Sequence, residues 1–157
     1  MKTIKALFNF FAILLVIFIL LILLLNSFLS NNLSKRQIFN LVEKYSNTIL
    51  VDIDEDNFED TLDIKGVTNV VSHDVTDIHC GGKGFGSATS YYGFYYYGND
   101  EPVVMFNGNI SKVDESEFIA DGKGFSYREK NIDGTVSDNT YYTEKILTGF
   151  YYYEWHF

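Results

Sequence analysis

Apolar residues dominate the first thirty positions of the chain, where they fill 23 of 30. Every residue in 10–25 is apolar, and the only polar residues in the wider stretch 6–29 are two asparagines and a serine. An α-helix needs about 20 predominantly apolar residues to cross the hydrocarbon core of a bilayer. We therefore expect a transmembrane helix at residues 6–29, with the lipid bilayer as its partner.

A cleaved signal peptide is the alternative for this segment. Its apolar region usually runs for about 7–15 residues and ends at a small-residue cleavage site, whereas the exit here, 25–30, has large residues where small ones are needed. Lys2 and Lys5 adjoin the apolar run, and Lys35 comes only after a polar spacer. Because positive charge favours the cytoplasmic side, we expect a single-pass protein of the cell membrane. Its parts would be a basic cytoplasmic N-terminus at 1–5, the helix at 6–29, a linker at 30–33 and an extracytoplasmic domain at 34–157.

An amphipathic helix is predicted at the start of that domain. Ser34 and Gln37 have the spacing of a capping box, which places the helix start at Lys35. Apolar residues then recur every three or four positions to about residue 52, as expected of a helix with one buried face. They are Ile38, Leu41, Val42, Tyr45, Ile49 and Leu50.

After Gly66 the pattern becomes that of strands, with short β-branched and aromatic runs between glycine, asparagine and aspartate clusters. The runs are 67–72, 75–80, 91–97, 103–106, 125–130, 141–146 and 150–157. Short links predict hairpins, one turning at His73-Asp74 and another joining 91–97 to 103–106. The predicted fold class is α+β, with the helix packed on an antiparallel meander sheet of six or seven strands.

Aromatic residues occupy both sides of the last predicted strand. Strand alternation separates Tyr151, Tyr153, Trp155 and Phe157 from Phe150, Tyr152, Glu154 and His156. Two alternatives follow. Either one face is exposed as an aromatic surface of the kind that binds sugars or peptides, or the sheet is covered on both sides, by the helix and by loops.

Composition narrows the possible partners. The chain has 12 Lys and Arg against 21 Asp and Glu, and without Lys2 and Lys5 the balance is 10 − 21 = −11. Nucleic acid is excluded because its recognition needs clustered cations. An envelope protein or a glycan remains as a partner. The single cysteine, Cys80, excludes an intrachain disulfide, and no cofactor is predicted.

The candidate binding residues come from the tyrosine-rich strands and from one polar strand face. Asp77 and His79 share that face; with His73 or His156 they would suit a metal, although two solvated side chains are the simpler interpretation. The full set is Tyr95, Tyr97, Tyr152, His156, Asp77 and His79.

No catalytic residue is predicted. Cys80 and His79 are consecutive strand residues and point to opposite faces, so Cys80 is interpreted as a small buried apolar side chain. A thiol enzyme would need a distant histidine, His73 or His156, beside Cys80. The glycine-rich stretch 81–86 does not open a helix as a phosphate-binding loop does, and it predicts a tight loop that crosses the sheet.

The acidic run 52–63 has the oxygen spacing of an EF-hand calcium loop. Its candidate ligands are Asp52, Asp54, Asp56, Asp60 and Asp63. Asn57 stands where such a loop needs glycine, and no exit helix is predicted after it. A solvated acidic run is therefore the simpler interpretation, and weak calcium binding is the alternative.

Several strings occur together in the domain. They are Cys80-Gly81-Gly82-x-Gly84, Ser87-x-Thr89-Ser90-Tyr91-Tyr92-Gly93-Phe94-Tyr95-Tyr96, Tyr141-Tyr142-Thr143-Glu144-Lys145-Ile146 and Phe150-Tyr151-Tyr152-Tyr153-Glu154-x-x-Phe157. Over about residues 34–157 this combination resembles a group of short membrane-anchored hypothetical proteins from Gram-positive, clostridia-like bacteria. The resemblance implies a single-pass or signal-bearing chain with the same helix-then-strands layout, and it implies no activity.

The function expected from the sequence is that of a membrane-anchored envelope protein with a non-catalytic binding or interaction domain. Two alternatives stay open. One is a small thiol-dependent enzyme that uses Cys80, and the other is an anchor subunit of a larger membrane complex.

Overall fold

The computed structural model describes residues 13–22, 33–85, 88–111, 113, 117–130 and 134–157. The chain divides into two compact units, Met1–Asn31 and Asn32–Phe157, and each is described by itself.

In the first unit the described residues, 13–22, form a helix whose large apolar side chains are all exposed. No helix within the described residues is both long and apolar enough to cross a membrane. The expected span extends into 6–12 and 23–29, and these residues, like 1–5 and 30–32, lie outside the described ones. The transmembrane helix therefore stays a prediction.

The second unit begins with helix α2 (Lys35–Glu55), which confirms the predicted start and extends three residues beyond the predicted end. The capping box is formed, with the Ser34 backbone N–H donating to Gln37 Oε1 at 2.8 Å. Ile38, Val42 and Ile49 of the predicted apolar face are buried, whereas Leu50 is exposed. After α2, a short helix, α3 (Glu59–Asp63), is held to it by Asp52.

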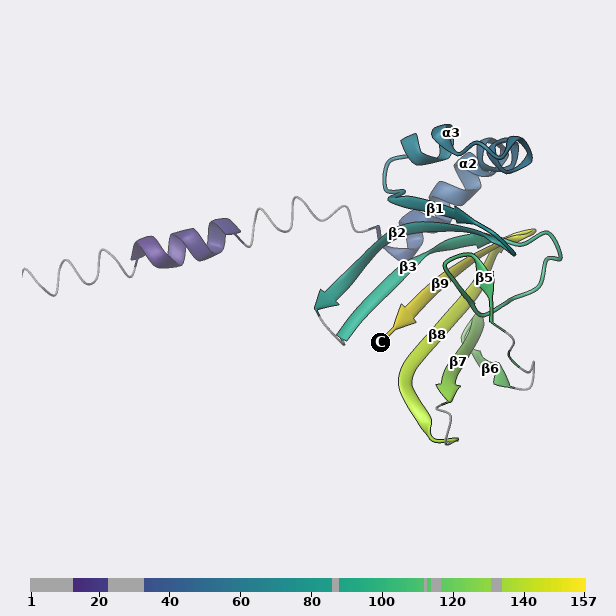
Figure 1. Cartoon of the computed structure of the whole chain (residues 1–157). Coiled ribbons are helices and arrows are strands. Elements are labelled where there is room, and N and C mark those ends of the chain that lie inside the picture. Colours follow the sequence, from purple (N-terminus) through teal and green to yellow (C-terminus); the bar gives the residue numbers. More distant parts are fainter. Residues whose placement is uncertain (1–12, 23–32, 86–87, 112, 114–116, 131–133) are drawn as a thin grey trace, which may run out of the picture. The chain divides into compact units, whose positions relative to one another are not determined.

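The sheet has seven antiparallel strands in the order β1-β2-β3-β9-β8-β7-β6 (Figure 1). The strands are β1 (Asn69–Ser72), β2 (Thr76–Phe85), β3 (Ala88–Tyr96), β6 (Ile119–Asp121), β7 (Gly124–Lys130), β8 (Val136–Leu147) and β9 (Phe150–His156). This confirms the α+β class with an antiparallel sheet of seven strands and few helices.

The prediction of a meander was wrong at one point. β3 is not followed by its neighbour in the sheet; the chain leaves, enters again at the far edge as β6, and returns strand by strand until β9 pairs with β3. The predicted hairpin between 91–97 and 103–106 does not form, because β9 occupies that side of β3. β9 therefore ends the chain but lies in the middle of the sheet.

The segment between β3 and β6 instead forms its own two-stranded hairpin, β4 (Met105–Phe106) and β5 (Asn109–Ile110). Its turn residues, Asn107 and Gly108, both have positive φ, 48° and 74°, as a tight type I′ hairpin turn requires. The Val75 N–H donates to the Gly108 carbonyl at 3.0 Å, which fixes the hairpin to the β1–β2 turn.

The central strands of the sheet are buried on both faces. On one face α2 covers a cluster that includes Ile78, Cys80, Phe94, Phe150 and Tyr152. On the other, the β4–β5 segment covers a cluster that includes Tyr95, Met105, Tyr141, Tyr153 and Trp155. Figure 1 shows α2 and the segment that carries β5 on opposite sides of the sheet. Of the two alternatives for the aromatic residues, coverage of both sides is therefore the one observed.

The helix is also tied to the sheet by a polar contact. Lys35 forms an ion pair with Glu144 of β8, and the Tyr142 hydroxyl donates to the same carboxylate at 2.7 Å. Burial alone would raise the pKa of Glu144, but the hydrogen bonds from Lys35 and Tyr142 outweigh it and hold that pKa below its ordinary value of 4.5. Burial would lower the pKa of Lys35, yet the same partners raise it above 10.5.

We predict that Lys35→Met lowers the free energy of unfolding by about 1–2 kcal/mol at pH 7, because it leaves the buried Glu144 carboxylate without its cation. Lys44→Met, at an exposed position of the same helix, is the control. A carboxylate with a lowered pKa stabilises above its ordinary pKa and loses that contribution as the pH falls through the lowered one. Thermal melts should therefore show the full deficit at pH 7 and a smaller one as the pH falls below 4.5; a deficit that does not change with pH would contradict the assignment.

Candidate functional site

A pocket of about 500 Å³ lies on the face of the sheet that the β4–β5 hairpin covers. Asp77 and His79 of β2 and Tyr153 of β9 contribute a connected set of polar groups. The hairpin adds Met105, Phe106 and Asn107, and the remaining lining residues are Thr89, Tyr91, Trp155 and Phe157. Its volume is in the range of ordinary small-molecule sites.

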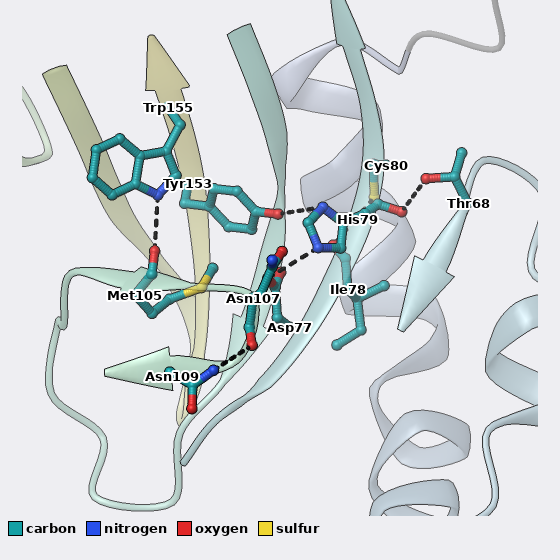
Figure 2. A network of polar contacts seen from close by, with 10 residues as sticks. All are labelled: Thr68, Asp77, Ile78, His79, Cys80, Met105, Asn107, Asn109, Tyr153 and Trp155. Atoms are coloured by element: carbon teal, nitrogen blue, oxygen red, sulfur yellow. Dashed lines mark hydrogen bonds and ion pairs between the residues drawn. The ribbon is translucent and has the colours of Figure 1, made fainter. Parts of the chain in front are cut away.

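The polar groups form a chain of contacts (Figure 2). His79 Nε2 lies 3.1 Å from Asp77 Oδ2, and His79 Nδ1 lies 3.1 Å from the Tyr153 hydroxyl. The side chain of Asp77 is only 1% exposed. The expectation that Asp77 and His79 share a strand face is confirmed, but Asp77 is buried and not solvated.

Gly93 explains how Tyr153 reaches His79. In the sheet register His79 pairs with Gly93, and Gly93 pairs with Tyr153, so the three residues form one row across β2, β3 and β9. Residues directly opposite each other on neighbouring strands point to the same face. Because the middle residue has no side chain, Tyr153 and His79 can meet across β3.

The Asp77 carboxylate has one oxygen without a partner. Oδ2 contacts His79, whereas Oδ1 is buried and makes no hydrogen bond to any part of the chain that the structure describes. Burial, and then the nearby Asp77 charge, raise the pKa of Tyr153 well above its ordinary value of 10. The phenol therefore keeps its proton at neutral pH, and both His79 and Asp77 are within reach as acceptors.

Aromatic rings make up the rest of the pocket. Trp155 stacks on Phe157 with ring centroids 5.4 Å apart, and Phe106 meets both rings edge-on at 6.4 and 6.3 Å. Tyr91 contacts Phe157 at 6.0 Å. Phe106 is 51% exposed and Tyr91 44% exposed, so these two rings border the opening to solvent.

Two hydrogen bonds hold the β4–β5 hairpin in place as one wall of the pocket. The Trp155 indole N–H donates to the Met105 carbonyl at 2.8 Å, within the buried cluster (Figure 2). The Ile110 N–H donates to Asp74 Oδ2 at 3.0 Å. The site is thus formed before any ligand arrives.

The other predicted binding residues are spread over the sheet. Tyr95 is fully buried on the pocket side of the sheet, where its hydroxyl accepts from the Val103 N–H at 3.0 Å; burial raises its pKa to about 12. Tyr97 lies beyond the end of β3 and accepts from Asn99 at 2.6 Å. These tyrosines hold local structure together and do not line the pocket.

Tyr152 and His156 point to the opposite face, as their alternation with Tyr153 requires. Tyr152 is buried under α2 against Phe39. His156 Nδ1 lies 2.8 Å from Ser90 Oγ. The predicted set therefore combined residues from two faces, and the structure brings only Asp77 and His79 together in the pocket.

Cys80 is fully buried on the α2 side of the sheet, and burial raises the pKa of its thiol to about 12. The thiol is therefore protonated at neutral pH, which is the reverse of an activated nucleophile. The glycines that follow belong to β2, up to Phe85, so the predicted tight loop at this point was wrong.

The acidic run does not gather into a calcium site. Asp52 is buried, and its Oδ2 accepts from both the N–H and the hydroxyl of Thr61 at 2.7 Å. Asp54, Asp56, Asp60 and Asp63 are exposed. Among the described residues, no group of three or more His, Cys, Asp or Glu side chains is arranged to hold a metal ion.

Sequence reasoning missed Phe106, Asn107, Tyr91 and the part played by Tyr153. Two signals pointed to them. The dipeptide Asn107-Gly108 is the strongest short-range indication of a hairpin, and a lone glycine inside a strand, such as Gly93, marks a close approach. Comparison with known proteins adds nothing to this assignment, because no family model, curated protein or solved structure matches the chain.

We predict that Gly93→Ala destabilises the domain by about 1–3 kcal/mol, the usual cost of an overpacked site. A Cβ atom there would lie 2.2 Å from the Ile78 carbonyl oxygen. Gly98→Ala is the matched control, because a Cβ at Gly98 meets no atom within 4 Å. Equal melting temperatures for the two variants would show that the row across β3 is not packed as described.

Proposed function

We propose that the chain is a non-catalytic binding protein, held at the cell membrane by its apolar N-terminal segment, whose ligand occupies the aromatic pocket. The observation that carries the proposal concerns Asp77, which lines the pocket and whose buried Oδ1 atom lacks a hydrogen-bond partner among the described residues. A buried polar atom without a partner costs free energy. A ligand that supplies the missing donor would recover it.

The chemistry of the linked Asp77, His79 and Tyr153 side chains favours binding over catalysis. Asp77 and His79 are arranged as the orienting carboxylate and the general base are in many nucleophilic enzymes, but the hydroxyl that His79 contacts is a buried phenol. Its raised pKa is the reverse of activation. The thiol enzyme is disfavoured in the same way by the raised pKa of Cys80.

The membrane part of the proposal rests on the sequence. The run 10–25 is wholly apolar, and the described helix within it exposes apolar side chains along its length. Orientation with the domain outside follows the positions of Lys2 and Lys5. A role as the anchor subunit of a larger complex is the second candidate, and the same apolar run supports it.

For the membrane attachment, we predict that alkaline carbonate leaves the full chain in the membrane pellet, and that protease added to intact protoplasts digests the domain. Replacing Leu15 and Leu20 together by Asp should release the chain, since a charge within a spanning helix opposes insertion. Release of the unaltered domain into the medium would instead indicate cleavage, and protection from protease would reverse the orientation.

For the pocket, Trp155 provides the readout because it is the single tryptophan and it lines the site. In a panel of small amines, sugars and short peptides, at least one class should change the Trp155 fluorescence saturably, and Phe106→Ala should weaken that response. Ile119→Ala, which removes an exposed apolar side chain of β6, should leave it unchanged. No saturable response from any class would refute the pocket as the binding site.

A further inference from the structure

The missing partner of Asp77 has to be a donor. An ionised carboxylate accepts hydrogen bonds and donates none. Its Oδ2 atom already faces His79, so the vacant acceptor is the buried Oδ1 atom. A ligand atom placed there must carry an N–H or O–H group.

The contacts of Asp77 within the pocket are to His79, not to a lysine or an arginine. With its proton on Nε2, His79 donates to Asp77 and leaves Nδ1 to accept from the Tyr153 hydroxyl. Among the described residues that line the pocket, none is a lysine or an arginine. The chain as a whole carries a net charge of −9, which attracts cations and repels anions.

The rings supply the second part of the recognition. Tyr91, Phe106, Trp155 and Phe157 contact one another and line the same pocket as Asp77. The face of an aromatic ring attracts a cation, most strongly when water is excluded. A buried carboxylate beside several rings is therefore complementary to a positive charge on an apolar body.

A sugar fits this distribution less well. Its hydroxyl groups surround the whole ring, and each needs a partner when it is buried. Here the groups Asp77, His79 and Tyr153 are joined in a single chain, and apart from Thr89 and Asn107 the other walls are aromatic or apolar. The arrangement suits a ligand with one polar end.

We infer that the pocket binds an organic ammonium ion, a protonated amine on a compact apolar body, with its N–H group on Asp77 Oδ1 and its apolar part against the rings of Phe106 and Trp155. This inference rests on the proposed function, whose site it uses.

The test is a titration of the full chain in a polyoxyethylene detergent, followed by Trp155 fluorescence at constant ionic strength. The probes are n-butylammonium and its neutral counterpart of similar shape, 1-butanol. The ammonium ion should bind roughly 10- to 100-fold more tightly, the ratio expected for one charge-assisted hydrogen bond. Equal affinities would overturn the inference without the use of any variant.

Single-residue variants test whether Asp77 is responsible for the preference for the amine. Asp77→Asn should remove the preference for the amine over the alcohol, whereas Asp63→Asn, the same change at an exposed position, should retain it. Phe106→Ala, at an exposed wall position, should weaken the binding of both probes. If Asp77→Asn does not fold, as shown by loss of its thermal transition, two other measurements still test the inference. They are the amine-to-alcohol affinity ratio of the unaltered chain and the binding of both probes by Phe106→Ala. An unchanged preference in folded Asp77→Asn would refute the assignment.

A third titration, with N-acetylglucosamine, separates the two levels of the proposal. A saturable response to the sugar and none to n-butylammonium would overturn the ammonium inference and leave the pocket as a binding site. No response to either probe, or to any member of the wider panel, would remove both.

Discussion

Strand β9 imposes the constraint on which the rest of the domain depends. It lies between β3 and β8 in the middle of the sheet and carries aromatic rings on both faces. Each face must therefore be removed from water. Helix α2 covers Phe150 and Tyr152, and the β4–β5 hairpin covers Tyr153 and Trp155. The pocket lies between the second cover and the sheet.

The site depends on this covered sheet and on two residues that differ from the aromatic residues around them. A carboxylate, Asp77, stands on a face that is otherwise mostly aromatic, and a glycine, Gly93, stands where a side chain would separate His79 from Tyr153. Burial of a charged group is unfavourable unless it is paired and hydrogen-bonded. Asp77 is only half satisfied, and groups of this kind are expected at functional sites.

Local signals predicted most of the elements and the β1–β2 hairpin, but not which strands pair across longer stretches of the chain. The start of α2 followed from Ser34 and Gln37, and the two faces of β9 followed from alternation. The pairing of β3 with β9 joins residues such as Tyr95 and Tyr151, which are far apart in the chain, and no local pattern fixes it. For the same reason Asp77 and His79 were found as one strand face, whereas the contact with Tyr153 depends on the order of three strands.

The claim that the β4–β5 hairpin closes the second face can be measured directly. Trp155 is the single tryptophan, so its indole N–H gives one identifiable proton resonance, and that group donates to the Met105 carbonyl. Hydrogen exchange followed by NMR should show this proton protected as strongly as the backbone amides of β3 and β9. Exchange at the rate of free indole, while those amides remain protected, would contradict the account.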